Sequence, residues 1–200
     1  MDKTQNRIGN IWSERYSTPK ASARTSWNKS AAVVGYVAEK ICGRPCKSVQ
    51  EANISLLRKL AGERKNYSRG ISVACGTGKE MLLLESGPVA HFDCWELSET
   101  AITAGKEEAK KRGLEERISF HYGDVFSKDV SSGKFDLVYW DNAMHHMFDT
   151  GQAMRWSRDA LADSGVFYMY DYVGPTRFQW RDEQMEIVKN VLESWMTNIF

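Results

Sequence analysis

The sequence lacks an excess charge of either sign, a long apolar run and an internal repeat. Its 200 residues carry a net charge of +1 at pH 7, which gives no electrostatic reason to expect nucleic acid as the main partner. No apolar segment approaches the ~20 residues of a membrane span, and the polar start MDKTQNRIGN has no signal-peptide pattern. We therefore predict a cytoplasmic protein, of a length that suits one domain, without a nucleic-acid or membrane partner.

Cysteine is scarce, and its spacing completes no zinc site. Cys42 and Cys46 form one close pair, whereas Cys75 and Cys94 each stand alone. A structural zinc site needs four ligands, commonly supplied as two close pairs. We therefore predict free, reduced cysteines and no bound metal.

What the chain does have is an alternation of short apolar runs with amphipathic stretches. Strands are predicted at residues 71–75, 89–95, 118–122, 135–140 and 166–173, and helices between and after them at 79–85, 98–112, 152–162 and 182–195. This alternation predicts an α/β three-layer sandwich, with a mostly parallel sheet and helices on both faces. Extra helices are predicted at 30–42 and 48–65, behind a polar arm that contains aromatic residues. We expect residues 1–66 to form a lid or substrate cap over the domain at 67–200.

A glycine turn directly follows the first predicted strand, in the stretch ISVACGTGKEM at residues 71–81. Glycine lets the backbone pass close to a ligand, and the start of the next helix favours an anionic group. Gly76 and Gly78 lack the third glycine of the dinucleotide fingerprint, because Met81 stands at its position. This difference counts against a nicotinamide cofactor without excluding it.

Acidic residues follow the second and third predicted strands, at the edge where parallel sheets bind ligands. Glu96 lies twenty positions after Gly76, which suits a carboxylate that accepts both hydroxyl protons of a ribose. Asp124 suits the exocyclic amine of a base, with a turn-forming role as the alternative.

The fourth predicted strand leads into WDNAMHHMFD, residues 140–149. Adjacent histidines on a helix point roughly 100° apart and are poor partners on one metal ion. We therefore favour a general base, His145 or His146, because imidazole titrates near neutral pH. The residue types do not decide between the two histidines.

A mixture of charged and aromatic residues surrounds a Gly-Pro turn after the fifth predicted strand. Such a mixture suits a polar or aromatic small molecule, and an arginine there suits a carboxylate or phosphate. An arginine and a tryptophan that only pack the loop are the alternative. The predicted substrate contacts are Asp171, Tyr172, Arg177 and Trp180.

Taken in order, these motifs resemble those of the class I S-adenosylmethionine-dependent methyltransferases that act on small molecules. The resemblance covers residues 70–173 and includes Ala-Cys-Gly-Thr-Gly at 74–78, Glu-Leu-Ser at 96–98, Gly-Asp at 123–124 and the histidine pair after Asn142. It implies a Rossmann-like fold, with residues 67–200 as the S-adenosylmethionine-binding methyltransferase domain.

The resemblance also implies which residues meet the cofactor, S-adenosylmethionine. The glycine turn would border the methionyl part, the acid after the second strand the ribose, and the acid after the third strand the adenine. The fourth strand end would lie near the sulfonium or the methionyl amine, and an N-terminal aromatic would close over the site. The implied cofactor-binding residues are Tyr16, Ala74, Cys75, Gly76, Gly78, Glu96, Leu97, Asp124, Val125, Asp141 and Asn142.

The chain departs from the family pattern in two respects. Ser72 and Ala74 stand where the family has an acid and a glycine, so we expect the methionyl amine to be held differently. The family also adds two strands after the last helix, and this chain ends at Phe200, so these C-terminal strands are missing. A truncated chain, strands from another chain and an abbreviated fold stay open, and an uncovered sheet edge makes a homodimer one expected assembly.

We therefore predict a methyl transfer from S-adenosylmethionine to an O or N nucleophile of a small polar or aromatic metabolite. The reaction would be an in-line displacement with a histidine base and without a metal. One alternative is a protein that binds the cofactor without turnover. A nicotinamide-dependent oxidoreductase is less favoured, because Tyr168, Tyr170 and Tyr172 have no lysine four positions later, as a Tyr-x-x-x-Lys constellation needs.

Overall fold

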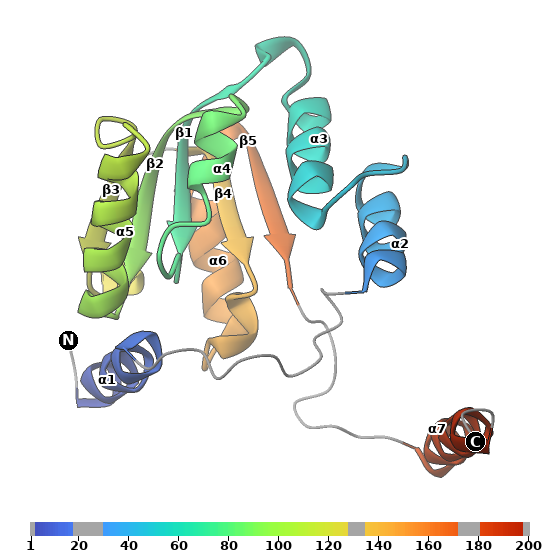
Figure 1. Cartoon of the computed structure of the whole chain (residues 1–200). Helices are drawn as coiled ribbons and strands as arrows, with labels where there is room; N and C mark the ends of the chain where they lie inside the picture. Colours follow the sequence, from blue (N-terminus) through green and yellow to red (C-terminus); the bar gives the residue numbers. More distant parts are fainter. Residues whose placement is uncertain (1–2, 18–29, 128–134, 172–180, 198–200) are drawn as a thin grey trace.

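A five-stranded parallel sheet forms the centre of the molecule (Figure 1). The computed structural model of the chain describes residues 3–17, 30–127, 135–171 and 181–197. In these residues the strand order is β3-β2-β1-β4-β5, and neighbouring strands all pair in parallel. The strands are β1 (Tyr67–Val73), β2 (Val89–Glu96), β3 (Ile118–Tyr122), β4 (Phe135–Asp141) and β5 (Leu161–Tyr170).

All five strands coincide in part with the predicted ones. β3 has the predicted limits, β2 and β4 each end one residue later than predicted, and β1 and β5 differ more. β1 begins earlier than predicted, at Tyr67, and β5 begins earlier too, at Leu161. The start of β1 is polar, yet the backbone N–H groups of Ser68 and Arg69 both donate to the Asp136 carboxylate, at 2.9 and 3.1 Å. The strand continues through these residues because β1 pairs with β2 there, Tyr67 with Val89 and Arg69 with His91.

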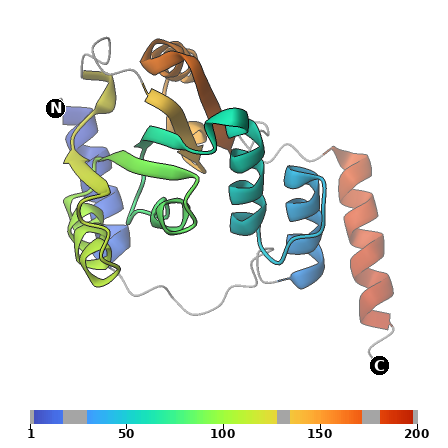
Figure 2. The ribbon, with the colours of Figure 1, turned by 90° about the horizontal axis from the view of Figure 1, so that it is seen from above.

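Helices cover both faces of the sheet, as predicted (Figure 2). α3 (Val49–Ala61), α4 (Met81–Glu85) and α5 (Glu99–Lys111) share one apolar cluster with the sheet, and α6 (Thr150–Ala160) shares the other. In β4, Leu137 and Tyr139 belong to the first cluster, and Val138 and Trp140 to the second. Because successive side chains of a strand point to opposite faces, a strand that is buried on both faces is apolar throughout.

The remaining helices lie at the margins of the sheet. α1 (Lys3–Ser17) is a helix where a polar arm was predicted, and α2 (Ala31–Cys42) packs on α3. The helix predicted at 48–65 ends at Ala61, because Gly62 adopts a positive φ of 56° and a short η2 turn (Gly62–Arg64) follows. α7 (Asp182–Thr197) follows the sheet. Within the described ranges, no helix has the length and apolar character to cross a membrane.

The strand order reverses between β1 and β4, which lie side by side. Ligands of open α/β sheets bind at such a reversal, outside the carboxyl ends of the strands. Ala74 follows β1 with φ 52° and Asn142 follows β4 with φ 53°. Left-handed backbone at a non-glycine residue costs about 1–3 kcal/mol and gathers at functional sites. The ends of β1 and β4 are therefore the candidate location of a functional site.

A buried hydrogen bond fastens α3 to β5, and its removal tests this packing. The Tyr168 hydroxyl donates to the Asn53 side-chain oxygen at 2.7 Å, with both residues buried. Tyr168→Phe leaves that oxygen without its donor, so we expect the free energy of unfolding to fall by about 1–2 kcal/mol in urea denaturation. Tyr122→Phe is the control, because Tyr122 is 49% exposed and should change stability by less than about 0.5 kcal/mol. Equal effects would contradict the role of the bond.

Candidate functional site

The Glu96 carboxylate, at the end of β2, holds the glycine turn in place. It accepts the backbone N–H groups of Gly76 at 2.8 Å, Leu97 at 2.8 Å and Ser98 at 3.0 Å, and Glu96 is only 6% exposed. Burial raises the pKa of Glu96, and the three backbone bonds oppose that rise. A carboxylate has about four acceptor positions, so these three backbone bonds use most of them. A contact with ribose stays a prediction.

Asp124, after β3, has both the turn-forming bond and a bond to α1. Its Oδ1 accepts the Phe126 N–H at 3.0 Å, which is the turn-forming role considered as the alternative. Its Oδ2 accepts the side-chain amide of Gln5 on α1. Val125 is buried beside it in the short η3 helix (Val125–Ser127). The adenine contact stays a prediction, and in this arrangement Gln5 and the Phe126 N–H bond the two oxygens of the Asp124 carboxylate.

Helix α1 packs on α5, beyond the carboxyl ends of the strands on the side of β2 and β3 (Figure 1). The Tyr16 hydroxyl lies so close to Gly76 that a Cβ added to that glycine would be 2.5 Å from it. Burial, and next the Glu96 charge, raise the pKa of Tyr16 to about 12. The Trp12 ring meets His146 edge to face at 5.1 Å. α1 thus lies beside the glycine turn, and the lid role of Tyr16 stays a prediction.

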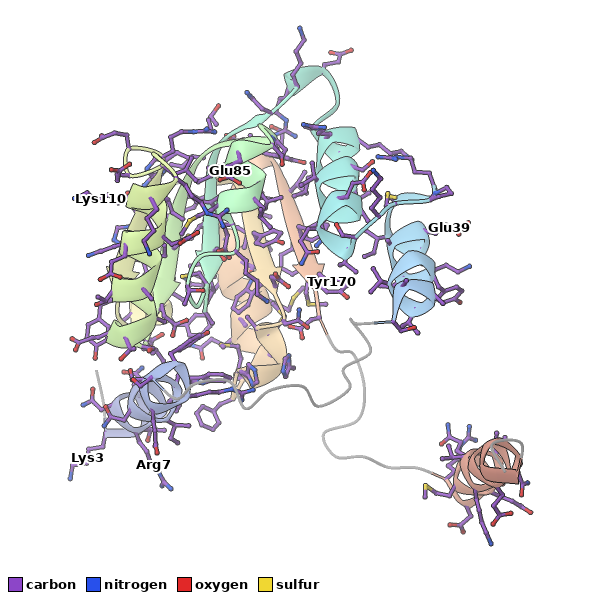
Figure 3. All side chains as sticks on the ribbon, in the orientation of Figure 1. Lys3, Arg7, Glu39, Glu85, Lys110 and Tyr170 are labelled. Carbon is purple, nitrogen blue, oxygen red and sulfur yellow. The ribbon has the colours of Figure 1, made fainter. Side chains whose placement is uncertain are left out.

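The charged side of α1 points outward. Lys3 and Arg7 project away from the sheet, and both are exposed (Figure 3). The inward side carries Gly9, which is buried against the Leu97 carbonyl. The helix is therefore amphipathic, and its less exposed residues are Gln5, Ile8, Gly9, Trp12 and Ser13.

A buried carboxylate also organises the loop after β4. Asp171 Oδ2 accepts the N–H groups of Ala143 at 3.1 Å, Met144 at 2.6 Å and His145 at 3.3 Å, and its side chain is 2% exposed. Asp171 was predicted to contact substrate, but here it anchors the η4 helix (Met144–His146). Its Oδ1 also bonds His145 Nδ1. Because a carboxylate only accepts, Nδ1 carries the hydrogen and Nε2 is the free acceptor of the neutral ring.

The second histidine has a different environment. The His146 ring lies between Trp12 and His145, with ring centres 5.1 and 3.8 Å away. Partial burial, and next the neighbouring His145, lower the pKa of His146, which favours its uncharged form. The two histidines thus differ in a way that residue types alone do not show: His145 is held by a carboxylate and His146 by aromatic packing.

Some of the other predicted site residues lie in the described part of the structure, and the rest lie outside it. Asn142 donates to Asp141 at 2.8 Å, and Asp141 lies 4.0 Å from the Lys79 ammonium. Ala74, Cys75 and Gly78 form the turn after β1. Tyr172, Arg177 and Trp180 lie outside the described residues. Within the described part of the chain, no three His, Cys, Asp or Glu side chains gather as a metal site requires.

One polar residue of the site is missed by the sequence analysis. Glu80, just before α4, is 2% exposed, and the Ser72 hydroxyl donates to its Oε1 at 2.5 Å. Its Oε2 has no hydrogen-bond partner among the described residues. Burial raises the pKa of Glu80 to about 7. The available signal was Ser72 in place of the family acid, with a carboxylate eight positions later.

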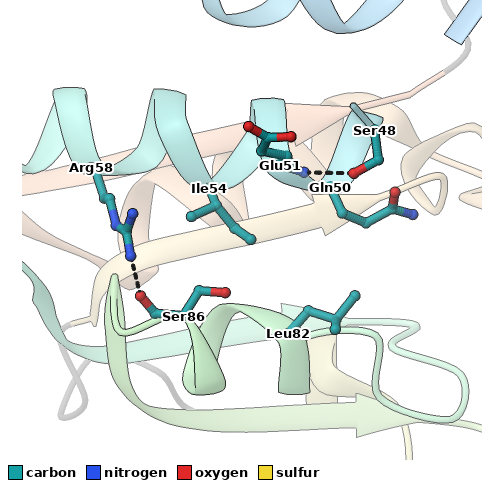
Figure 4. Close-up of a pocket in the computed structure, with 7 residues that line it drawn as sticks. All are labelled: Ser48, Gln50, Glu51, Ile54, Arg58, Leu82 and Ser86. Carbon is teal, nitrogen blue, oxygen red and sulfur yellow. Dashed lines mark hydrogen bonds between the residues drawn. The ribbon is translucent and has the colours of Figure 1, made fainter. Parts of the chain in front are cut away.

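A separate groove of about 520 Å³ lies between α3 and α4 (Figure 4). Its polar groups serve the fold: the Ser48 hydroxyl caps α3 through the Glu51 N–H at 3.1 Å, and Arg58 donates to the Ser86 carbonyl. None of the predicted site residues lines it. The lining residues are Ser48, Gln50, Glu51, Ile54, Arg58, Leu82 and Ser86.

The sheet order, the glycine turn after β1 and the acid after β2 define an α/β nucleotide-binding domain. A family model described as a methyltransferase domain matches residues 65–199. The chain therefore belongs to this methyltransferase family, and its class is that of the S-adenosylmethionine-dependent methyltransferases, as the motifs indicated.

Relatives agree with this assignment. The 27-O-demethylrifamycin SV methyltransferase of Amycolatopsis mediterranei is 23% identical, over 63% of this chain and 47% of its own. Demethylmenaquinone methyltransferase of Leptospira interrogans is 25% identical, over 62% and 51%. Among solved structures, the cyclase SpnF has a TM-score of 0.56 at 18% identity, over 84% of this chain and 60% of that one. The chain spans about half the length of the curated relatives it matches.

The packing of α1 can be tested at a glycine. A Cβ on Gly9 would lie 2.4 Å from the Leu97 carbonyl oxygen, so Gly9→Ala should push α1 off the strand ends. We expect faster hydrogen exchange throughout α1 and a lower melting temperature. Gly35→Ala in α2 is the matched control, because nothing lies within 4 Å of its Cβ and alanine favours a helix by about 0.5–1 kcal/mol. Unchanged exchange in Gly9→Ala would contradict the docking of α1.

Proposed function

We propose that this chain transfers a methyl group from S-adenosylmethionine to an O or N nucleophile of a small polar or aromatic metabolite. The observation that carries the proposal is the meeting of two features where the strand order reverses. The glycine turn follows β1, and an imidazole held by a buried carboxylate follows β4. α1 spans both, with Tyr16 against Gly76 and Trp12 against His146.

The residues present suit the cofactor. A side chain at position 76 would meet the Tyr16 hydroxyl, so glycine keeps the turn open to a ligand. The unpartnered, buried oxygen of Glu80 lies at the start of the helix after that turn. When bound, S-adenosylmethionine supplies an electrophilic methyl group on a sulfonium sulfur. Glu96 and Asp124 would then hold the ribose and adenine, after the backbone and Gln5 give up part of their bonds to them.

The main contributions of the chain to catalysis would be to position the nucleophile against the methyl group and to exclude water from the site. Holding a nucleophile in line with a methyl group is worth about 7–11 kcal/mol in favourable cases. α1 covers the strand ends and keeps water from them, which favours transfer to the acceptor over side reactions. The acceptor would enter beside η4, where the side chain of His145 is 33% exposed.

We assign the general base to His145, because its Nδ1 is bonded to Asp171 and its Nε2 is the acceptor. That nitrogen would take the proton from the acceptor's hydroxyl or N–H as the methyl group arrives. Asp171 is then a positioning residue that fixes the tautomer and the loop. A positioned base typically contributes about 10²–10⁴-fold.

Binding without turnover is the second candidate. Ser72 and Ala74 depart from the family pattern, and a solved structure with this fold is named as a cyclase, so the fold alone does not determine methyl transfer. This candidate predicts cofactor binding without a methylated product from any acceptor.

Calorimetric titration tests the cofactor. We expect micromolar binding of S-adenosylmethionine and S-adenosylhomocysteine, and much weaker binding of NAD, because the third glycine of the dinucleotide turn is absent. Glu96→Ala should abolish or greatly weaken binding, since it removes both the ribose acceptor and the clamp on the turn. Glu99→Ala, on α5 nearby, is the control. Preferential binding of NAD would instead support the alternative that the protein is a nicotinamide-dependent oxidoreductase.

Substitution of the histidines tests the base. With an acceptor found by screening phenols, carboxylic acids and amines against a radiolabelled methyl donor, His145→Asn should lower kcat about 100-fold and leave cofactor affinity unchanged. Asp171→Asn should lower kcat through the same imidazole. His91→Asn is the control, because His91 bonds only Ser119 in the described structure, at 3.3 Å near the start of β2. Full turnover in both His145→Asn and His146→Asn would show that neither histidine acts as the general base.

A further inference from the structure

The buried pair of Ser72 and Glu80 is not explained by the fold. Ser72 is fully buried in β1, and its hydroxyl donates to Glu80 Oε1 at 2.5 Å. Glu80 Oε2 is buried and has no hydrogen-bond partner in the described parts of the chain. A buried carboxylate oxygen that lacks a partner costs stability. A leucine or glutamine would fill the same space more favourably, so the carboxyl group indicates a ligand.

Among the described residues, no lysine, arginine or histidine nitrogen forms an ion pair with Glu80. The ammonium group that acts on it, that of Lys79, belongs to a side chain that is 66% exposed and lies 4.0 Å from Asp141 instead. The other titratable groups that interact with Glu80 are a carboxyl group, two phenols and two thiols. They come from α1, from the turn, from β2 and from β4, and are Tyr16, Cys75, Cys94, Tyr139 and Asp141.

We propose that Glu80 supplies the carboxylate that binds the methionyl ammonium group of the cofactor, in place of the acid that Ser72 replaces. This inference rests on the proposed function. The position is suitable because Glu80 directly follows the glycine turn. Ser72, in the strand β1 that precedes the turn, orients the Glu80 carboxyl group through its hydrogen bond. A primary ammonium has three donors and matches an oxygen that has no partner. Glu80 would then discriminate ligands that carry the amino-acid part from ligands that lack it.

The proposal predicts a proton balance. Burial raises the pKa of Glu80 to about 7, so part of the ligand-free protein holds a proton there at neutral pH. An ammonium group favours the ionised carboxylate. Binding should therefore release a fraction of a proton from Glu80 to the solvent, whereas a carboxyl group with a purely structural role would release none.

The experiment is calorimetric titration of the full chain at pH 7, in two buffers of different ionisation enthalpy. The ligands are S-adenosylhomocysteine and 5′-methylthioadenosine, which lacks the amino-acid part. We expect Glu80→Gln to weaken S-adenosylhomocysteine roughly 10- to 100-fold, to leave 5′-methylthioadenosine unchanged, and to abolish the proton release. Glu85→Gln, exposed on α4, is the matched control and should change none of the three. Adding Ser72→Asp to Glu80→Gln should restore part of the lost affinity.

The stability of the ligand-free proteins provides an independent measurement. A carboxyl group whose pKa is higher in the folded than in the unfolded state stabilises the fold at low pH and loses that effect as pH rises. The stability of the wild type relative to Glu80→Gln should thus fall between pH 4.5 and about 7. A folded Glu80→Gln protein is required for the binding comparison, and if it does not fold, Ser72→Ala tests the same selectivity.

The outcomes separate this inference from the proposed function. If the wild type binds S-adenosylhomocysteine, but Glu80→Gln binds it equally well and with the same proton release, Glu80 is not the ammonium ligand. Equal weakening of both ligands would assign Glu80 a structural role and also overturn the inference. If the wild type binds neither ligand, the proposed function itself fails, and the inference fails with it.

Discussion

A carboxylate inside a protein needs hydrogen-bond donors, and this requirement organises the strand ends of the sheet. Glu96 meets it with three backbone N–H groups, one of them from the glycine turn, so the turn and the end of β2 form one unit. Asp171 meets it in the same manner with the loop after β4. Each carboxylate converts flexible loop backbone into a defined surface, because an unsatisfied charge there costs several kcal/mol.

Glu80 is the exception among the buried carboxylates. Ser72 satisfies one of its oxygens, and the other has no partner within the described residues. Proteins rarely keep such a group without a use, since burial of an unpaired polar atom costs about 1–3 kcal/mol. The left-handed backbone of Ala74 and Asn142 lies at the same two strand ends. Strain and an unsatisfied acid thus occur together where the strand order reverses, which is the part of the sheet that accepts ligands.

Much of the fold was predictable because burial follows simple periodicities. The strand–helix alternation predicted the parallel sheet with helices on both faces, and the structure confirms both. The predicted limits of β1 and β5 were wrong. β1 begins earlier because its polar first residues pair with β2 and bond to Asp136, and apolar patterning does not indicate such contacts. The arm at residues 3–17 is a helix whose less exposed side mixes glycine, serine, glutamine and tryptophan with one isoleucine, a pattern weaker than an aliphatic one.

The sequence by itself determined the class of the protein, because the order of glycine turn, acids and histidines along the chain follows from strand ends meeting at one edge of a parallel sheet. The family match confirms that class. Only the tertiary structure distinguished the two histidines, showed that Asp171 bonds the loop after β4, and paired Glu80 with Ser72. These relations join residues from separate elements, and a hydrogen bond between them depends on distances of a few ångströms that spacing along the chain does not encode.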